Sequence, residues 1–330
     1  MLPPLLRHGA DNAPPSSYPH TTCLEGTIIE KPAVLKASTP GSHPVIRAVW
    51  LLGFVLLIGA VALFAFRSFA YPALAILAAA CFLLGLLAYV IRHVRFLGTL
   101  ARGEAALRAG DLRAARAIAA PLVDRYPLFP PVQRLAGLVL YPSGDPLSAA
   151  TLLESAARSM RDRDVTVTLV AAYAALNKAG DARRAAAVRA GDPDVRLALA
   201  WAELVALGGD RARGATLAAE LPADSPSRAA MAATLQAIAA AHRGDDTAVR
   251  ARLRDAEDRY ILVEPDERAF LGYLGGVALR EAGAIDDARA TFTLAMESAP
   301  ETIGEALARR ERAHLSSGPA SSSSDQPSAD

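Results

Sequence analysis

Two long runs of apolar residues lie in the first third of the chain. The first run, 48–66, contains no charged or strongly polar side chain, and the second, 72–91, is interrupted only by Gly85 and Tyr89. A helix rises 1.5 Å per residue, so about 20 apolar residues cross a hydrocarbon core about 30 Å thick. Neither run has the polar stripe that a helix in a soluble core usually exposes. The pattern predicts two transmembrane helices rather than a buried soluble hairpin.

The connection between the two runs is short, from Arg67 to Tyr71. Helices joined so closely form an antiparallel hairpin, which we place at 45–92, with both chain termini on one side of the membrane. Basic residues flank the hairpin at both ends, whereas the loop contains Arg67 alone. The positive-inside rule therefore predicts that the regions before and after the hairpin face the cytoplasm. We expect a location in the cell (inner) membrane of a bacterium, with lipid around the hairpin.

The two ends of the chain have compositions typical of disordered segments. Residues 1–44 are rich in proline with scattered Ser, Thr and His, and residues 315–330 are rich in Ser, Pro and Asp. The chain has two cysteines, Cys23 in the first of these segments and Cys81 in the second apolar run. We do not expect them to form a disulfide, and two distant thiols do not make a metal site.

Beyond the hairpin, a helical stretch, a glycine and an alanine-rich stretch recur with a period near 35 residues. The glycines are Gly110, Gly144, Gly180, Gly209, Gly244 and Gly283, and an aspartate follows each of them except the last. Such a period is typical of stacked helix-turn-helix arrays. We expect each glycine to adopt the left-handed conformation that ends the first helix of a pair. Each aspartate should accept amide hydrogens at the start of the second helix.

The region 95–314 resembles the tetratricopeptide repeat (TPR) family, whose units of about 34 residues favour small residues at positions 8 and 20. The resemblance implies that paired helices cross at these positions. Three units carry small residues there in register: Gly103 and Ala115, Gly137 and Ala149, and Gly276 and Ala288. In the last unit, Phe292 and Pro300 also match at positions 24 and 32. The middle units depart from the pattern, since Tyr173 replaces a small residue and the fourth unit is short.

These features predict an all-α chain, with a transmembrane helical hairpin followed by an α-solenoid of about six TPR-like helix-turn-helix units. The order of segments is similar to that of HemY-type membrane TPR proteins, although no residue match supports a haem-related role. The alternative fold for 95–314 is a generic antiparallel helical bundle. An insertion at 258–268 lengthens the last glycine spacing, and we expect it to form a loop. A short tether, 92–96, should join the hairpin to the first repeat.

Charge and motifs argue against nucleic-acid binding and against catalysis. Lys and Arg number 35 and Asp and Glu number 34, so the formal net charge is +1 and provides no basic field for a nucleic acid. The sequence contains no nucleophile elbow, phosphate-binding loop or zinc-binding helix motif, and its six histidines are scattered. We therefore expect a non-enzymatic protein without catalytic residues, cofactor or metal.

The TPR resemblance also implies that four positions of each first helix line a concave groove. The candidate partner-binding residues are Leu100, Glu104, Leu107, Arg134, Leu138, Tyr141, Val170, Asn177, Arg196, Glu203, Phe270, Tyr273 and Arg280. A mainly apolar groove suits an amphipathic or extended apolar segment of a protein partner. The alternative is that half of these side chains merely pack against neighbouring helices. Some TPR domains bind the C-terminal carboxylate of chaperones through two asparagines together with Lys and Arg from adjacent repeats. Such a clamp is excluded here, because 95–314 contains one asparagine, Asn177, and one lysine, Lys178.

The expected function is that of a membrane-anchored scaffold or adaptor for protein–protein interaction at the cytoplasmic membrane. Alternatively, the chain is an accessory subunit of a membrane enzyme or transport complex and binds through its transmembrane hairpin. Small residues in the first run, such as Gly53, Gly59 and Ala60, permit the close helix packing that this alternative needs. An enzyme is the third and least supported class.

Overall fold

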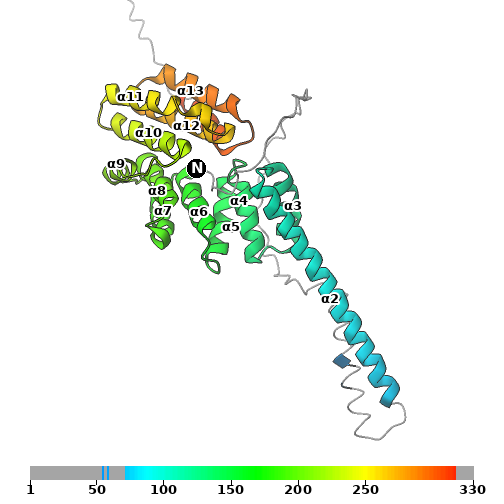
Figure 1. Cartoon of the computed structure of the whole chain (residues 1–330). Coiled ribbons are helices and arrows are strands. Elements are labelled where there is room, and N and C mark those ends of the chain that lie inside the picture. Colours follow the sequence, from blue (N-terminus) through cyan, green and yellow to red (C-terminus); the bar gives the residue numbers. More distant parts are fainter. Residues whose placement is uncertain (1–53, 56–57, 59–70, 317–330) are drawn as a thin grey trace, which may run out of the picture. The chain divides into compact units, whose positions relative to one another are not determined.

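The computed structural model describes residues 54–55, 58 and 71–316, and the described residues form helices without a β-strand (Figure 1). Most of the first apolar run and nearly all of both predicted tails therefore lie outside the described residues. Backbone contacts divide the chain into two units that meet between Leu135 and Ala136. The expectation of an all-α protein is confirmed for the described part of the chain.

The N-terminal unit contains α2 (Tyr71–Arg108) and α3 (Leu112–Arg125), which pack against each other. In the first half of α2, apolar side chains such as Leu83 and Leu87 are exposed, whereas Leu100 and Leu107 in the second half are buried. One segment of the described chain, Ala79–Arg108, is long and apolar enough to cross a membrane. Residues 92–96, the predicted tether, lie within the continuous helix α2.

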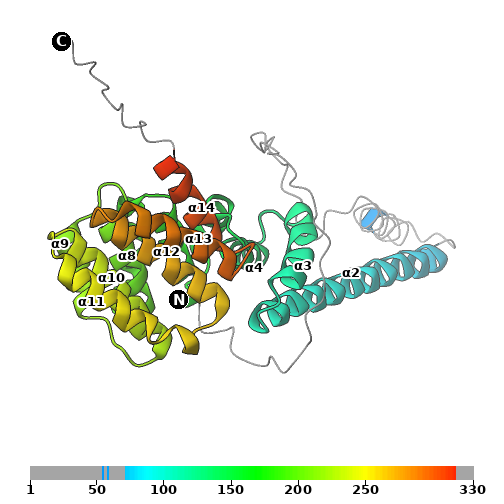
Figure 2. The ribbon, with the colours of Figure 1, turned by 90° about the horizontal axis from the view of Figure 1, so that it is seen from above.

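The second unit consists mainly of paired helices. Its elements are the end of α4 (Pro130–Leu140), then α5 (Pro146–Ala157), α6 (Arg163–Ala175), α7 (Ala179–Ala186), α8 (Pro193–Val205), α9 (Arg211–Ala219), α10 (Pro226–Ala241), α11 (Asp246–Glu257), α12 (Pro265–Glu281), α13 (Ile285–Ser298) and α14 (Ile303–Ser316). Helices α6, α8, α10 and α12 each pack against the next helix in the chain, and each of the first three also packs against the next member of this series. Helix α14 packs on α12 and α13 in the same way (Figure 2).

The inner and outer helices of the pairs differ in burial. Every residue of α6 from Val165 to Ala175 is buried, and α8, α10 and α12 are buried over most of their length. The following helices α7, α9, α11 and α13 bury only two or three side chains each, spaced along one face. An alanine-rich inner helix can be covered on several sides because its side chains take little space.

Glycine and aspartate build most of the turns within the pairs. The left-handed conformation occurs at Gly110, Gly144, Gly244 and Gly283, with φ of +77°, +86°, +73° and +78°. The side chains of Asp111, Asp145, Asp210 and Asp245 each accept a hydrogen bond from the backbone amide three residues later. These positions confirm the predicted division of labour, in which glycine ends one helix and aspartate caps the next.

Two turns in the middle of the array differ from the prediction. Gly180 lies inside α7, and the chain reverses earlier, at Asn177, whose φ is +59°. Asparagine tolerates the left-handed region better than most residues with a side chain. In the next pair, Gly208 rather than Gly209 has positive φ, at +72°. The glycine spacing therefore misplaced these two helix ends by one to three residues, and Asp181 does not cap a helix.

The predicted loop at 258–268 is shorter in the structure. A turn of 3₁₀ helix, Tyr260–Leu262, follows α11, and α12 already begins at Pro265. Proline suits the first position of a helix because its missing amide hydrogen would have no acceptor there. The last four residues of the predicted loop, 265–268, are therefore helical.

Paired helices approach most closely where the sequence places glycine. A Cβ atom on Gly137 would lie 2.5 Å from Cγ of Leu153, and one on Gly276 would lie 2.4 Å from Cε1 of Phe292. A Cβ atom on Gly103 would lie 3.1 Å from Cγ2 of Ile118 on α3. The alanines predicted to pack opposite, Ala115, Ala149 and Ala288, are fully buried. The helices are thus close enough that no side chain fits at the glycine positions.

Buried carboxylates hold neighbouring helices in register. Asp192, the N-cap of α8, accepts hydrogen bonds of 2.6 and 3.2 Å from Arg163 at the start of α6. Asp194 is also buried and pairs both with Arg163 and, at 3.1 Å, with Arg228 of α10. Burial alone would raise the pKa of Asp192, but the bonds from Arg163 and from backbone amides lower it. The starts of three inner helices are thereby connected.

Glu203 ties the end of α8 to its neighbours. Its fully buried carboxylate accepts hydrogen bonds of 2.7 and 2.6 Å from Arg183 on α7 and one of 2.8 Å from the backbone amide of Asp210. Burial opposes ionisation, yet the bonds from Arg183 and Asp210 hold the pKa of Glu203 below its ordinary value. The ionised carboxylate of Glu203 therefore stabilises the turn between α8 and α9.

Two neighbouring glycines provide a matched test of the helix crossing. We expect Gly276→Ala to destabilise the protein by about 1–3 kcal/mol, because the new methyl group collides with the buried Phe292 ring. Gly275→Ala should be neutral or stabilise by up to about 1 kcal/mol, since its nearest neighbours are 3.7 and 3.8 Å away and glycine weakens a helix. Denaturant unfolding followed by circular dichroism measures both. Equal effects of the two substitutions would contradict the close crossing.

A second test concerns the charge on Glu203. Glu203→Gln should destabilise the protein by about 2 kcal/mol at neutral pH, because it leaves Arg183 without its buried counterion. The native pKa lies below the unfolded value of about 4.3, so the charge stabilises the fold fully above that pH and less as pH falls through the native pKa. The difference between wild type and variant should therefore shrink on acidification. Glu220→Gln, in the exposed pair with Arg196, is the control and should change stability little.

Candidate functional site

Most of the predicted groove residues are buried in the structure. In the N-terminal unit, Leu100 and Leu107 face the interior, and Nη1 of Arg134 lies 3.1 Å from Oε1 of Glu104. In the second unit, the buried members are Leu138, Tyr141, Val170, Glu203, Phe270 and Tyr273, and the partly exposed members are Asn177, Arg196 and Arg280. Burial of this kind is what the packing alternative expects. Which of these residues meets a partner stays a prediction.

An aromatic cluster joins inner helices that are not consecutive in the array. The ring centroids of Trp201 on α8 and Phe270 on α12 lie 4.9 Å apart in an edge-to-face arrangement, and Tyr273 lies 6.3 Å from Trp201. Burial raises the pKa of Tyr273 and of Tyr141, and the Tyr273 phenol raises that of Tyr141 further. Trp201 was not among the predicted site residues, because it lies outside the groove positions of the repeat.

The C-terminal helix α14 brings together the two ends of the second unit. On α12, Arg280 donates a hydrogen bond to the buried Glu311, and a Cβ atom on Gly304 would lie 2.5 Å from the backbone nitrogen of Phe270. At the other end, the amide of Ile303 donates to the carbonyl of Pro142 at 2.9 Å. Arg310 likewise donates to the carbonyl of Ala175 at 2.9 Å. Two of the predicted groove residues, Phe270 and Arg280, therefore contact α14.

A capping pattern in the sequence could have revealed where α14 begins. Glu305 accepts a hydrogen bond of 2.7 Å from the amide of Glu301, and its own amide donates to Oγ1 of Thr302. This is close to the reciprocal Thr-x-x-Glu arrangement that marks helix starts. The recurring glycine gave no signal there, because Pro300 and Glu301, with φ of +61°, form the turn instead.

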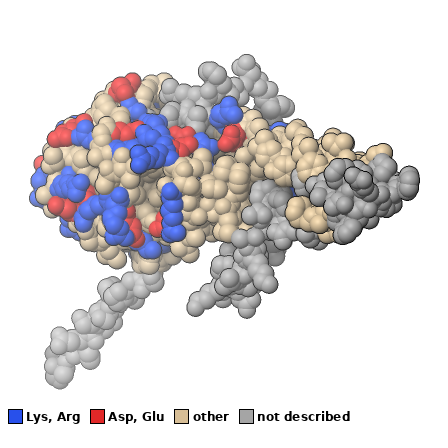
Figure 3. All heavy atoms as spheres, turned by 90° about the horizontal axis from the view of Figure 1, so that it is seen from below, with Lys and Arg blue, Asp and Glu red and all other residues tan. Residues whose placement is uncertain are grey.

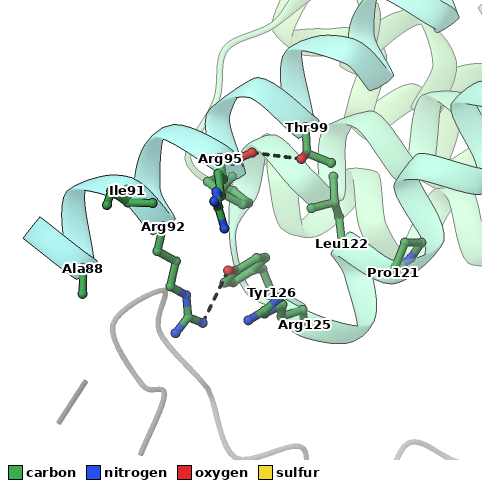
Figure 4. A pocket seen from close by; sticks show the side chains of 10 residues that line it. Ala88, Ile91, Arg92, Arg95, Thr99, Pro121, Leu122, Arg125 and Tyr126 are labelled. Carbon is green, nitrogen blue, oxygen red and sulfur yellow. Dashed lines mark hydrogen bonds between the residues drawn. The ribbon is translucent and has the colours of Figure 1, made fainter. Parts of the chain in front are cut away.

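A pocket of about 570 Å³ lies between α2 and the end of α3 (Figure 4). Its polar lining consists of Arg92, Arg95 and Thr99 from α2 and Arg125 and Tyr126 from the end of α3. Its apolar lining consists of Ala88, Ile91, Phe96, Pro121 and Leu122. From the sequence, Arg92 and Arg95 are only charges beside the predicted membrane segment, since nothing local shows that α3 folds back beside them.

Arg92 has few hydrogen-bond acceptors in this pocket. Nη2 of Arg92 is 3.5 Å from the Tyr126 hydroxyl, while its Nε and Nη1 are buried without a hydrogen-bond partner among the described residues (Figure 4). The Arg125 guanidinium lies 5.8 Å from the centre of the Tyr126 ring. No Asp or Glu is among the lining residues. The pocket is therefore positively charged on one side and apolar on the other.

The described residues hold no group of three or more His, Cys, Asp or Glu side chains placed to bind a metal. Basic and acidic side chains are interspersed over the face of the molecule shown in Figure 3. His242 is occupied within the array, where Nε2 is 2.9 Å from the carbonyl of Leu204 and Nδ1 is 3.5 Å from Oε2 of Glu281.

The pairing of Arg280 with Glu311 predicts how firmly α14 is held. We expect Glu311→Gln to raise the hydrogen-exchange rates of the α14 amides about tenfold, because the buried ion pair is lost. Exchange in α13 should stay unchanged. Glu297→Gln, at an exposed position of α13, is the control. Unchanged exchange in α14 would show that its apolar contacts alone hold the helix.

Comparison with known proteins adds no relative to this geometry. No protein-family model matches the sequence, and no curated protein matches it. The functional interpretation therefore depends on the residues and contacts of this chain itself.

Proposed function

We propose that this chain is a membrane-anchored, TPR-like scaffold or adaptor that holds a protein partner at the cytoplasmic face of a cell membrane. The observation that carries the proposal is the continuity of α2. Exposed apolar side chains extend along this helix as far as Val94 and Leu97, and the buried Leu100 and Leu107 follow in the same helix. Lipid is the natural cover for such a surface, so the first helix pair continues directly from the anchor.

The paired helices support the scaffold part of the proposal. Each inner helix contacts its own partner and the next inner helix, which is the nearest-neighbour arrangement of repeat proteins that present long binding surfaces. We propose the groove set as the partner region. Within the second unit, a partner segment could reach Asn177, Arg196 and Arg280 without unfolding, because these side chains keep solvent exposure.

A second function is favoured by the burial of the remaining groove residues. If the groove residues serve only to pack the helices together, the exposed apolar face of α2 is the surface whose burial by a partner would stabilise a complex most. The chain would then be an accessory subunit of a membrane enzyme or transport complex, bound through the proposed two-helix hairpin. Helix packing in lipid depends on close contact and small residues rather than on a hydrophobic driving force.

Photo-crosslinking in the full-length chain separates the two functions. A photoreactive residue in place of Arg196 should capture a protein partner if the scaffold proposal is correct, and one in place of the exposed Arg250 on α11 is the control. A photoreactive residue in place of Leu87 should capture lipid. Protein capture at position 87 without capture at position 196 would favour the accessory subunit and overturn the scaffold.

Membrane insertion and topology form a separate prediction. The full-length chain should remain in the membrane fraction after alkaline carbonate extraction. Leu83→Arg combined with Leu87→Arg should weaken retention, since each arginine in a span costs about 2.5–3.5 kcal/mol. A reporter active only in the periplasm should be silent when fused after Pro319 and active when inserted after Ser68. An active fusion at Pro319 would reverse the proposed orientation.

A further inference from the structure

The polar lining of the α2–α3 pocket follows one face of α2. Arg92, Arg95, Thr99 and Arg102 are separated by three, four and three residues, so they lie on the same side of the helix. Nη2 of Arg102 donates to Oγ1 of Thr99 at 3.3 Å, which places a fourth guanidinium beside the row. Arg125 approaches the same space from the end of α3. Positively charged side chains of α2 and α3 therefore meet in this pocket.

The guanidinium group of Arg92 has no carboxylate among the residues that line the hollow. The buried Nε and Nη1 of Arg92 have no hydrogen-bond partner among the described residues, and the lining includes no Asp or Glu. A buried guanidinium without a counterion is unfavourable by several kcal/mol in general. A bound anion would remove this cost, and guanidinium groups match the geometry of phosphate oxygens especially well.

The other half of the hollow indicates that the anion carries apolar chains. Ala88 and Ile91 of the lining lie on the stretch of α2 whose side chains are exposed and apolar, including Leu84 and Leu87. A soluble anion would leave this apolar wall in contact with water. A phospholipid would place its phosphate among the arginines and its acyl chains along Ile91 and Leu87. The direction of α2 matches this order, since the apolar turns precede the basic ones.

We propose that the α2–α3 pocket binds the phosphate of an anionic phospholipid at the membrane surface. Arg92, Arg95 and Arg125 pair with the phosphate, and the hydroxyl groups of Thr99 and Tyr126 are close enough to the row to hydrogen-bond the headgroup. The volume of about 570 Å³ is in the range of small-molecule sites. The inference depends on the proposed insertion of α2, because insertion brings the pocket to the headgroup layer.

Lipid binding would also stabilise the first helix pair. Because Arg125 belongs to α3 and Arg92 to α2, a phosphate held between them connects the two helices. A ligand that binds only the folded state raises its stability in proportion to the logarithm of ligand concentration. Anionic lipid should therefore protect α3 from unfolding, whereas zwitterionic lipid should not.

Native mass spectrometry of the full-length chain in neutral detergent tests the proposal. The probes are short-chain phosphatidylglycerol and phosphatidylcholine of equal chain length. We expect the wild type to prefer phosphatidylglycerol, and Arg92→Gln with Arg125→Gln to lose about 25-fold in affinity for it, or about fivefold for each arginine. The control, Arg113→Gln with Arg116→Gln, removes two exposed arginines of α3 outside the pocket lining and should keep the preference.

A charge-retaining variant and a single exposed variant protect the test against misfolding. Arg92→Lys should keep part of the preference, because it retains the charge without the fork of donors. Arg95→Gln changes an exposed side chain and should reduce affinity about fivefold with unchanged helix content by circular dichroism. If Arg95→Gln and the double variant both bind phosphatidylglycerol like the wild type, the pocket does not hold the headgroup and the proposal fails.

Two further arms separate the source of the phosphate and the role of insertion. Inorganic phosphate and glycerol 3-phosphate, at the same concentration as the lipid, should not displace it. Displacement at equal concentration would assign the pocket to a soluble phosphate and overturn the lipid. Insertion into pure phosphatidylcholine vesicles should be the same for wild type and variants. Insertion without any lipid preference would overturn only this inference, whereas failure to insert would overturn the proposed function as well.

Discussion

The arrangement of the helical array depends on how closely two helices approach where their side chains are smallest. At Gly137 and Gly276, the facing residues Leu153 and Phe292 fill the space in which a Cβ atom would stand. Large apolar residues then pack onto backbone rather than onto other side chains, which gives a dense interface from an alanine-rich sequence. The inner helices can be buried along most of their length for the same reason. Bulkier residues at these crossings would force the paired helices apart.

Ion pairs and hydrogen bonds fix how the closely packed helices are aligned along their lengths, whereas apolar burial drives the packing itself. Asp192 and Asp194 pair with arginines of the neighbouring inner helices α6 and α10, and Glu203 stabilises the turn at the other end of α8. Helix α14 completes the arrangement through Arg280 and Glu311 on one side and through the carbonyl of Ala175 on the other. The second unit is therefore held by contacts between residues that are far apart in sequence.

The helical class, the period of the pairs and most of the turns could be predicted, because each depends on local chemistry. Where a glycine precedes an aspartate between two helical stretches, the glycine ends the first helix and the aspartate caps the second. The helix ends at Asn177 and Gly208 were not predicted, because a helix can end before the Gly-Asp pair when an earlier residue adopts positive φ. The burial of the groove residues and the pocket beside α2 could not be predicted, because both depend on which helices meet in space. Nothing between Arg92 and Phe96 interrupts a helix, so the predicted tether is a continuous part of α2.

Because α2 is continuous, the direction of α3 about the α2 axis is fixed relative to the apolar side chains in the first half of α2. A helix turns by about 100° for each residue, so the direction in which α3 leaves the axis is determined by the number of residues between the exposed apolar side chains and Leu100. Inserting one residue at Gly98 would keep every local interaction of the span and still rotate the first helix pair by about 100° about the axis. Over 38 residues the helix is about 57 Å long, so a small change in the tilt of the span would displace its far end by several ångströms. In the proposed membrane-inserted state, the tilt of α2 in the bilayer would set the orientation of the first helix pair.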